Sequence, residues 1–336
     1  MTTNWRDVLI AYLHDPPDKA MQIRGHEPRA RKYLRVALGD DVSEAELKDP
    51  SDRLAAIAER LPAPHWETLK VSSHEGEFIT RHPLSGVESR LFTCEWSQSD
   101  IVRAIEQLVQ SIDDTERRFL VIWRRLAEKL SIDYHDTYAR LPADTRVPDH
   151  TRWQHLDTTA ALKAAGAGSS SNAAFLSFSL GPVQSFIAAA RSLRDLWSGS
   201  MILARLTFEG MLPVIERFGP TALIYPALRG LPWLDLWLRE ERGLGEAVSD
   251  PSTDLRTAPC IPNRFLALVP SGLDGNIAGE VALACRQRAQ QAWQKIARSV
   301  HDALDQAWGS SNPVWDARWS DQIDHYFEIR TPLSFT

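Results

Sequence analysis

A run of small and polar residues interrupts the chain near its middle, where residues 163–174 read KAAGAGSSSNAA. Side chains this small bury little apolar surface, and stretches rich in glycine and serine behave as flexible linkers. The chain has 336 residues, which is more than one hydrophobic core usually organises. The run therefore predicts a first domain over residues 1–163, a linker over 164–174 and a second domain over 175–336.

Upstream of this linker, apolar residues recur at helical spacing. The pattern predicts helices over residues 5–13, 54–61, 101–112 and 119–130. Asp100 and the pair Asp113-Asp114 are the predicted N-caps of the last two helices. Residues 65–96 mix Gly, Pro and Ser with alternating residues, which predicts an irregular insertion with a short hairpin. We expect an N-terminal domain that is essentially all-α.

Downstream of the linker, strand patterns alternate with helical ones. Runs of β-branched and aromatic residues predict strands over residues 175–180, 222–225, 265–269 and 325–330. Helical patterns begin after Gly181-Pro182 and continue over residues 201–218, which end at Gly219-Pro220, and over residues 277–308. This order favours an α+β fold in which helices cover one face of an antiparallel sheet.

Composition excludes several classes of protein. The net charge of −6 argues against a surface that is basic throughout, although local basic patches can still bind nucleic acid. The three cysteines, Cys94, Cys260 and Cys285, form no CxxC pair, which excludes a zinc ribbon and a disulfide framework and fits a reducing compartment. The N-terminus has no signal-peptide pattern, and no apolar run approaches the ~20 residues of a membrane span. We therefore expect a cytoplasmic protein without a membrane partner.

The first helical stretch ends in an adjacent histidine and aspartate, His14-Asp15, followed by Pro16-Pro17. An imidazole and a carboxylate side by side can both reach a divalent metal, which then polarises a phosphoryl oxygen and lowers the pKa of a bound water. The dipeptide alone is weak evidence, because the chain contains a second copy at His135-Asp136.

Further candidate ligands surround the first copy and occur where helices are expected to begin. They are His26, Asp52, His150 and His155. A helical bundle can gather one or two ligands from each of several helices. Each candidate has a structural alternative: Asp52 can cap its helix, His155 can be a core residue, His26 can lie on a surface helix, and His150 can brace a turn.

The segments LHDPPDK, RGHEPRA, SDRLAAIAERL and LPADTRVPDHTRWQHLDTTAAL resemble the N-terminal HD domain of the large subunit of type III-B CRISPR effector complexes. In that family the HD fold is circularly permuted, so the His-Asp motif comes first and the helix with the remaining histidine comes last. The resemblance implies a metal site formed by His14, Asp15, Asp52 and His155. It implies that His26 binds a second metal or the scissile phosphate, that Asp18 supports the site, and that Lys19 takes part in catalysis. It leaves His150 open between a ligand and a structural role.

The segments FLSFSLGPVQSFIAAARSLRDLWSGSMILARL, IYPALRG and IPNRFLALVP resemble the first palm-like domain of the same subunit, a ferredoxin-like βαββαβ fold. In that family, cyclic oligoadenylate synthesis depends on a Gly-Gly-Asp-Asp turn in a second palm. The chain lacks this motif, and Gly39-Asp40-Asp41 reads as a polar turn. Ser198 and Ser200 either line a nucleotide pocket or flank a Gly-Ser kink between two helices. ATP is therefore expected only if another chain supplies the second palm.

The resemblance implies a nuclease that cuts single-stranded DNA with one or two divalent transition-metal ions, such as Mn²⁺ or Ni²⁺. Its expected partners are the other subunits of an RNA-guided antiviral complex, the guide CRISPR RNA, target RNA and a second-palm polypeptide. The chain ends soon after the fourth predicted strand. We therefore expect it to be a fragment, a truncated product or half of a split subunit. Two alternatives stay open: a catalytically weak scaffold that docks neighbouring subunits and the guide RNA 5′ end, and a phosphohydrolase for free nucleotides.

Overall fold

The computed structural model describes residues 3–59, 72–74, 77–82, 85–92, 97–144, 149–167, 172–308 and 312–335. The chain folds into two compact units. The helical unit comprises Thr2–Ser170 and Arg229–Pro251, and the sheet unit comprises Ser171–Leu228 and Ser252–Thr336. Arg229–Pro251 thus belongs to the helical unit, although in the chain it lies between two strands of the sheet unit, inside the predicted second domain.

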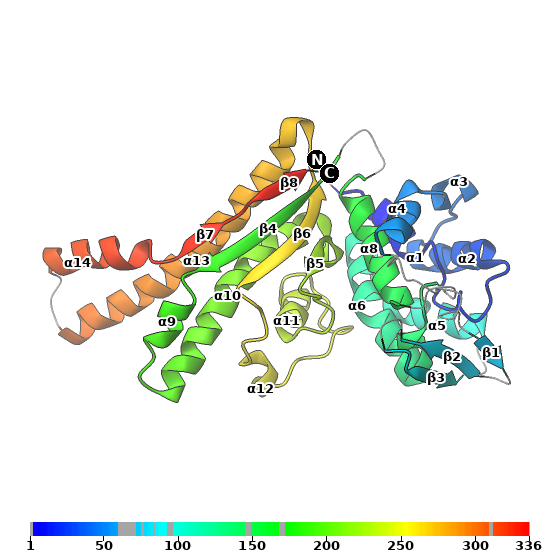
Figure 1. Cartoon of the computed structure of the whole chain (residues 1–336), viewed down its shortest axis with the longest axis horizontal. Helices are drawn as coiled ribbons and strands as arrows, with labels where there is room; N and C mark the ends of the chain where they lie inside the picture. Colours follow the sequence, from blue (N-terminus) through cyan, green and yellow to red (C-terminus); the bar gives the residue numbers. More distant parts are fainter. Residues whose placement is uncertain are drawn as a thin grey trace. The chain divides into compact units, whose positions relative to one another are not determined.

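Amphipathic helices build most of the helical unit (Figure 1). They are α1 (Trp5–Leu13), α2 (His26–Leu38), α3 (Glu44–Leu47), α4 (Pro50–Glu59), α5 (Gln98–Val109), α6 (Thr115–Asp133), α7 (Thr137–Arg140), α8 (Arg152–Ala164) and α11 (Pro232–Glu240). Helix α1 packs against α6 and α8, and its residues from Val8 to Leu13 are all buried. Helix α8 starts at a capping box in which Thr151 and Gln154 satisfy each other's backbone N–H groups. This cap fixes where the helix begins and hence where His155 lies.

The sequence predicts an essentially all-α domain here. The helical unit, however, also contains a small antiparallel sheet. Its strands are β1 (Ser72–His74), β2 (Glu77–Arg81) and β3 (Glu88–Phe92), paired in the order β1-β2-β3. Strands β2 and β3 form a hairpin within the segment where the sequence predicts one. The predicted cap of α5 was wrong: Ser97 accepts from the Ser99 N–H, while Asp100 lies in the first turn. Asp114 caps α6 as predicted.

An antiparallel sheet organises the other unit. Its strands are β4 (Ala173–Gly181), β5 (Leu223–Tyr225), β6 (Arg264–Pro270), β7 (Glu328–Arg330) and β8 (Leu333–Phe335). The strand order is β5-β6-β4-β7, β8 also pairs with β4, and all these pairs are antiparallel. The helices are α9 (Gln184–Ala188), α10 (Leu193–Phe218), α12 (Thr253–Arg256), α13 (Asn276–Trp308) and α14 (Pro313–Trp319). Short 3₁₀ turns cover Pro220–Ala222 and Leu273–Gly275, and a π turn covers Ser320–Asp324.

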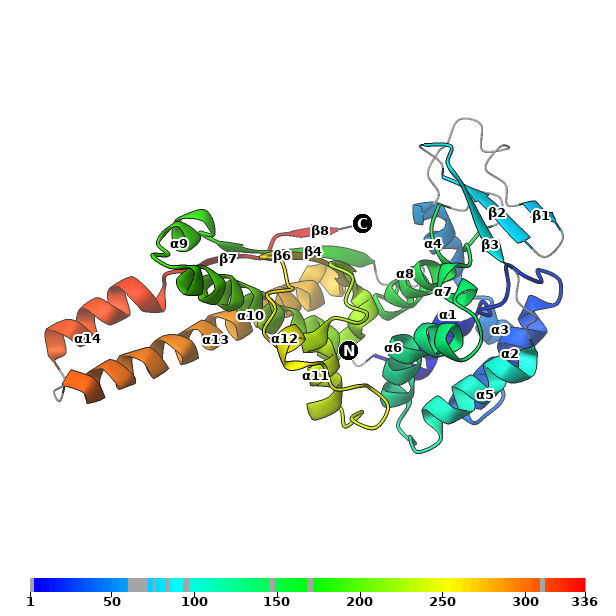
Figure 2. The ribbon, with the colours of Figure 1, turned by 90° about the horizontal axis from the view of Figure 1, so that it is seen from below.

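Helices α10 and α13 cover one face of this sheet, as the sequence predicts (Figure 2). Alternate residues of β4, such as Leu176 and Phe178, are buried beneath them, whereas Phe175 on the opposite face is exposed. This alternation follows from the two-residue repeat of a β-strand, which turns successive side chains to opposite faces. The unit therefore buries its core between one sheet face and two long helices.

The break between the two helices that follow β4 lies earlier than the sequence predicts. Ser198 and Ser200 do not flank a kink, because α10 runs without interruption from Leu193 to Phe218. The interruption comes instead at residues 189–192, between α9 and α10. Gly199 has another role: a Cβ there would lie 3.3 Å from Ile187 Cδ1, so glycine lets α9 pack closely on α10. Among the described residues, no helix is both long and apolar enough to cross a membrane.

Candidate metal centre

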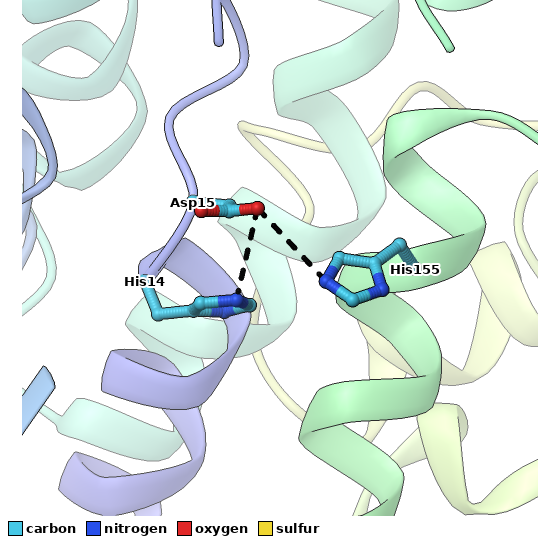
Figure 3. A group of neighbouring side chains, drawn as sticks. All are labelled: His14, Asp15 and His155. Carbon is cyan, nitrogen blue, oxygen red and sulfur yellow. Dashed lines mark ion pairs between the residues drawn. The ribbon is translucent and has the colours of Figure 1, made fainter. Parts of the chain in front are cut away.

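Three helices of the helical unit bring four of the candidate ligands together. His14 is the C-cap of α1 and Asp15 follows it, Asp52 lies in the first turn of α4, and His155 lies near the start of α8. The Nε2 atoms of His14 and His155 are each 3.3 Å from Asp52 Oδ1. They are 3.8 and 3.9 Å from Asp15 Oδ2 (Figure 3). Four side chains from three separate segments of the chain thus lie close together.

The two histidines are oriented in the same way. His14 Nδ1 donates to the carbonyl oxygen of Ala11 over 2.7 Å, and His155 Nδ1 lies 2.8 Å from Glu59 Oε2. Both rings therefore turn Nε2 toward the carboxylates, as metal-bound histidines do when an acceptor holds the other nitrogen. His14 Nε2 is buried and has no hydrogen-bond partner. An orphaned buried nitrogen facing carboxylates fits a cation bound by His14, Asp15 and His155, whose ligand atoms lie within 4.8 Å of one another, with Asp52 next to the two histidines.

Asp15 is also held by two cationic side chains. Lys19 Nζ lies 2.7 Å from both of its carboxylate oxygens, and Arg152 Nη1 lies 2.6 Å from Oδ2. Burial would by itself raise the pKa of Asp15, but His14, Arg152 and Lys19 hold that pKa well below its usual range. Asp15 is therefore ionised and fixed in place. Sequence reasoning missed Arg152, because nothing in a sequence distinguishes a buried arginine at a helix start from an exposed one.

Glu59, at the end of α4, contacts the Nδ1 side of the His155 ring. Its Oε2 atom also lies 3.2 Å from His150 Nε2, and His150 Nδ1 is 2.6 Å from Asp149 Oδ1. Burial would raise the pKa of Glu59, but hydrogen bonds from His150 and His155 lower it to about 2. Burial would lower the pKa of His155, but hydrogen bonds to Asp52 and Glu59 raise it to about 9. Without a metal, His155 is therefore protonated at neutral pH, and a bound cation would replace that proton.

A cavity of about 700 Å³ adjoins the cluster. Its polar lining combines Asp15, Asp52 and His155 with Lys19, Arg53 and Arg152, and Ile23 and Ile57 contribute apolar surface. Of the two cations that contact Asp15, Lys19 is the more exposed, with a side chain 24% exposed against 3% for Arg152. The cavity therefore offers positive charge, for an anionic group, beside the converging ligands.

Three other sequence candidates lie outside the cluster. His26 begins α2, with Nδ1 3.0 Å from the Ile23 carbonyl oxygen, and it does not line the cavity. Asp18 is fully buried and forms an ion pair with Arg29 Nε at 2.9 Å, which fits a supporting role for the loop after Asp15. At the second His-Asp pair, Asp136 pairs with Arg140, and His135 joins no ligand group among the described residues.

The sheet unit contains two further candidates. Ser198 and Ser200 lie within α10, where Ser200 Oγ donates to the Leu196 carbonyl oxygen at 2.9 Å. On α13 and α14, His301 lies among carboxylates, but its Nε2 faces Asp316 at 3.0 Å and its Nδ1 faces Asp305 at 3.6 Å. His301, Asp305 and Asp316 thus form a separate group of possible ligands in the sheet unit.

Known proteins resemble this chain over most of its length. Residues 175–298 match the family described as CRISPR-associated protein Cmr2, N-terminal. The chain is 28% identical over 346 residues to the CRISPR system Cmr subunit Cmr2 of Pyrococcus furiosus. It is 25% identical over 308 residues to the CRISPR system CMR subunit Cmr2 of Saccharolobus solfataricus. The chain is thus similar to Cmr2 proteins over most of its length. The resemblance to the large subunit of type III-B systems is thereby confirmed.

The chain spans only part of the length of the Cmr2 proteins that it matches. The two alignments cover 87% and 78% of this chain but 38% and 29% of the relatives. Two solved structures share its fold: the apo state of a type III-B Cmr-beta complex, with a TM-score of 0.69 and 19% identity, and the same complex bound to cognate target RNA, with 0.68 and 21%. They match 100% and 97% of this chain, and 37% and 36% of their own chains. The family match over residues 175–298 does not include the four ligands, so the chemistry of that site is inferred from its geometry.

Proposed function

We propose that this chain is the nuclease portion of a type III-B large subunit, a metal-dependent HD-type phosphodiesterase that cuts single-stranded DNA. One observation carries the proposal: two imidazole Nε2 atoms and two carboxylates from three helices converge beside a cavity that contains cationic side chains. The choice of single-stranded DNA as substrate follows from the resemblance to the HD domain, because the residues themselves indicate only phosphodiester hydrolysis.

The donor set fits a divalent transition metal. Two imidazoles and two carboxylates suit Mn²⁺, Ni²⁺ and similar ions, and the ligands would be His14, Asp15, Asp52 and His155. Such an ion would polarise a phosphoryl oxygen and generate a hydroxide nucleophile near neutral pH. Glu59, His150 and His155 form an adjacent group whose ligand atoms lie within 4.8 Å of one another, and a second ion would bind there in place of the hydrogen bonds between Glu59 and the two histidines.

The cationic residues have different roles in this proposal. Arg152 is buried and makes hydrogen bonds to Asp15 and to the Ala143 carbonyl oxygen, so it orients the carboxylate. Lys19 reaches the cavity and is long enough to move between Asp15 and a bound phosphate. Arg53 lines the same cavity and would contact the phosphate backbone beside the scissile bond.

The topology of the sheet unit supports its interpretation as a palm-type domain. Its elements follow the βαββαβ order with strands arranged β5-β6-β4-β7, which is the ferredoxin-like arrangement. As part of a Cmr2 protein, the chain would assemble with other effector subunits, guide CRISPR RNA and target RNA; one of the two structural relatives is itself bound to cognate target RNA. Cyclic oligoadenylate synthesis is not expected from this chain alone, because its sequence lacks a Gly-Gly-Asp-Asp turn. Ser198 and Ser200 would approach ATP only beside a second palm.

The test is cleavage of end-labelled single-stranded DNA by the full chain with Mn²⁺ and with a chelator. We expect cleavage that requires Mn²⁺ and falls at least ~100-fold in His14→Ala and Asp15→Ala, because each change removes a ligand. His135→Ala is the matched control, since it changes the histidine of the second His-Asp pair, outside the cluster. Equal cleavage by His14→Ala and wild type would contradict the site. Release of phosphate from mononucleotides without polymer cleavage would instead indicate that free nucleotides are the substrates.

A scaffold without catalytic activity is the second candidate, and one observation favours it. Lys19 and Arg152 already neutralise Asp15, so the carboxylate is satisfied without a metal. In that case the chain would bind the neighbouring subunits and the guide RNA 5′ end, and neither Mn²⁺ nor the His14→Ala change would alter assembly or DNA degradation. Binding of Mn²⁺ by wild type that is lost in His14→Ala would argue against this candidate.

A further inference from the structure

Arg229 contacts several helices of the helical unit. It follows Leu228 directly and opens the segment Arg229–Pro251, which completes the helical unit. Its Nε donates to the Trp123 carbonyl oxygen at 3.0 Å, and its Nη2 donates to Tyr12 Oη at 3.1 Å and to Asp157 Oδ1 at 2.5 Å. The guanidinium thus joins α6, α1 and α8 at once. We call Arg229, Tyr12, Trp123 and Asp157 the Arg229 cluster.

The residues of the Arg229 cluster also contact one another. The Trp123 Nε1–H donates to the same Asp157 oxygen at 3.0 Å, and the guanidinium carbon lies 5.2 Å from the centre of the Trp123 ring. Tyr12 and Trp123 are buried, and the Arg229 side chain is 22% exposed. A planar guanidinium with several donors suits such a site, because it can bind a carboxylate, a hydroxyl and a carbonyl together while its face packs on an aromatic ring.

Two of these contacts lie on the helices that carry the metal ligands. Tyr12 precedes His14 by two residues, and Asp157 follows His155 by two residues. Successive residues of an α-helix are turned by about 100°, so residues two apart point to nearly opposite sides. Helices α1 and α8 pack against each other, with the ligands on one side of the pair and the Arg229 cluster on the other.

We infer that Arg229 is a positioning residue for the candidate metal centre: it fastens α1 to α8 and so fixes the distance between His14 and His155, whose ring centres are 5.5 Å apart. The inference rests on the proposed function, since it assigns Arg229 to the same metal site. Arg229 touches neither the ligands nor the lining of the cavity, so it acts only through the two helices.

The test measures the affinity of the full chain for Mn²⁺ alone by titration calorimetry, with the Mn²⁺ EPR spectrum as a readout of coordination. We expect Arg229→Ala to weaken Mn²⁺ binding by ~10- to 100-fold, the usual effect of losing a group that orients metal ligands. Arg229→Lys keeps the charge beside Asp157 but cannot make all three hydrogen bonds, so it should restore part of the affinity and of the EPR signal.

Arg242→Ala is the matched control. Arg242 belongs to the same segment and ties it to α6 through Glu116, at 3.3 Å, while its guanidinium lies over the Trp237 ring. It contacts neither α1 nor α8 in the described structure, so its removal should leave the Mn²⁺ affinity within ~2-fold of wild type. The inference is overturned if Arg229→Ala binds Mn²⁺ as wild type does, or if Arg242→Ala loses as much affinity, which would indicate a general effect of loosening the segment.

Hydrogen exchange of the metal-free chain separates this inference from the proposed function. Arg229→Ala should raise amide exchange at residues 10–14 and 153–159, and Arg242→Ala should not. If wild type binds no Mn²⁺ while this exchange pattern appears, the metal site is wrong and the helix fastening stands. If Mn²⁺ binds at His14 but the exchange of α1 and α8 is the same in Arg229→Ala and wild type, the role of Arg229 is wrong and the metal site stands.

Discussion

At the scale of single residues, the centre contains an ionised pair formed by one ligand, His155, and its neighbour Glu59. His155 and Glu59 lie 2.8 Å apart, and their side chains are 7% and 13% exposed. The folded pKa of His155, about 9, lies above its unfolded value, and the folded pKa of Glu59, about 2, lies below its own. Both shifts mean that folding favours the charged forms. The pair therefore stabilises the metal-free fold within a definite pH range.

We predict that this stabilisation is greatest between about pH 4.5 and 6.5. Above that range it should be lost as the pH rises through 9, because the folded state then releases the His155 proton. Below that range it should be lost as the pH falls toward 2, because Glu59 becomes protonated. The upper loss should amount to ~1–3 kcal/mol of unfolding free energy. Urea unfolding at pH 6.5, 8 and 9 with a chelator measures it.

Glu59→Gln should reduce this upper pH dependence, because it removes one of the two carboxylates that hold the His155 proton. Glu106→Gln on α5 makes the same chemical change at an exposed position outside the cluster and should retain the dependence of wild type. If the free energy of unfolding falls with pH equally in Glu59→Gln and wild type, the His155–Glu59 pair does not contribute to this pH dependence.

At the scale of elements, the packing of α10 on the sheet depends on one glycine. A Cβ on Gly210 would lie 2.9 Å from Phe178 Cε2 and Cζ on β4. The Phe178 ring cannot easily yield, because it is fully buried and stacks on Phe265 with centroids 4.7 Å apart. We predict that Gly210→Ala destabilises the chain by ~1–3 kcal/mol, because overpacking outweighs the gain of up to ~1 kcal/mol in helix propensity.

Gly279→Ala is the matched helical control for this prediction. Gly279 lies exposed in α13, and a Cβ there would meet no atom within 4 Å. The change should therefore stabilise the chain by ~0.5–1 kcal/mol. Thermal or urea unfolding of both variants gives the comparison, and the same sign of effect in the two would contradict the packing argument.

The helix boundaries also show which parts of the fold can be predicted from the sequence. Periodicity places α1 at Trp5–Leu13 and ends α10 at Gly219-Pro220, because amphipathic spacing and helix-stopping residues are local signals. It misplaces the break before α10, since Gly199 serves the approach of α9, which is a contact in space. At the metal centre, the histidines and Asp52 were identifiable from their motifs. Arg152 and Glu59 were not, because their role comes from burial beside residues 137 and 96 positions away.

At the scale of the whole molecule, the helical unit is completed by a segment from between β5 and β6. Arg124 on α6 and Asp235 on α11 make a bidentate ion pair, with Nε–Oδ1 at 2.6 Å and Nη2–Oδ2 at 2.7 Å, and their side chains are 11% and 8% exposed. Arg117 Nη2 also donates to the Gly243 carbonyl oxygen at 2.7 Å. A fragment cut at the small-residue linker would leave these arginines and the Arg229 site without their partners.

We therefore predict that a fragment of residues 1–170 is less stable than the helical unit within the full chain by several kcal/mol. Loss of Asp235 alone leaves the largely buried Arg124 with Glu128 as its remaining carboxylate partner, and losing hydrogen bonds to a charged group costs ~1.5–3 kcal/mol. Joining residues 229–251 to that fragment through a flexible Gly-Ser linker should restore much of the difference, because the segment supplies Arg229, Asp235 and Gly243 together. Urea unfolding of the two fragments measures the gain, and an Asp235→Ala version of the longer fragment is the control. Equal stability of the two fragments would mean that residues 1–170 fold independently of this segment.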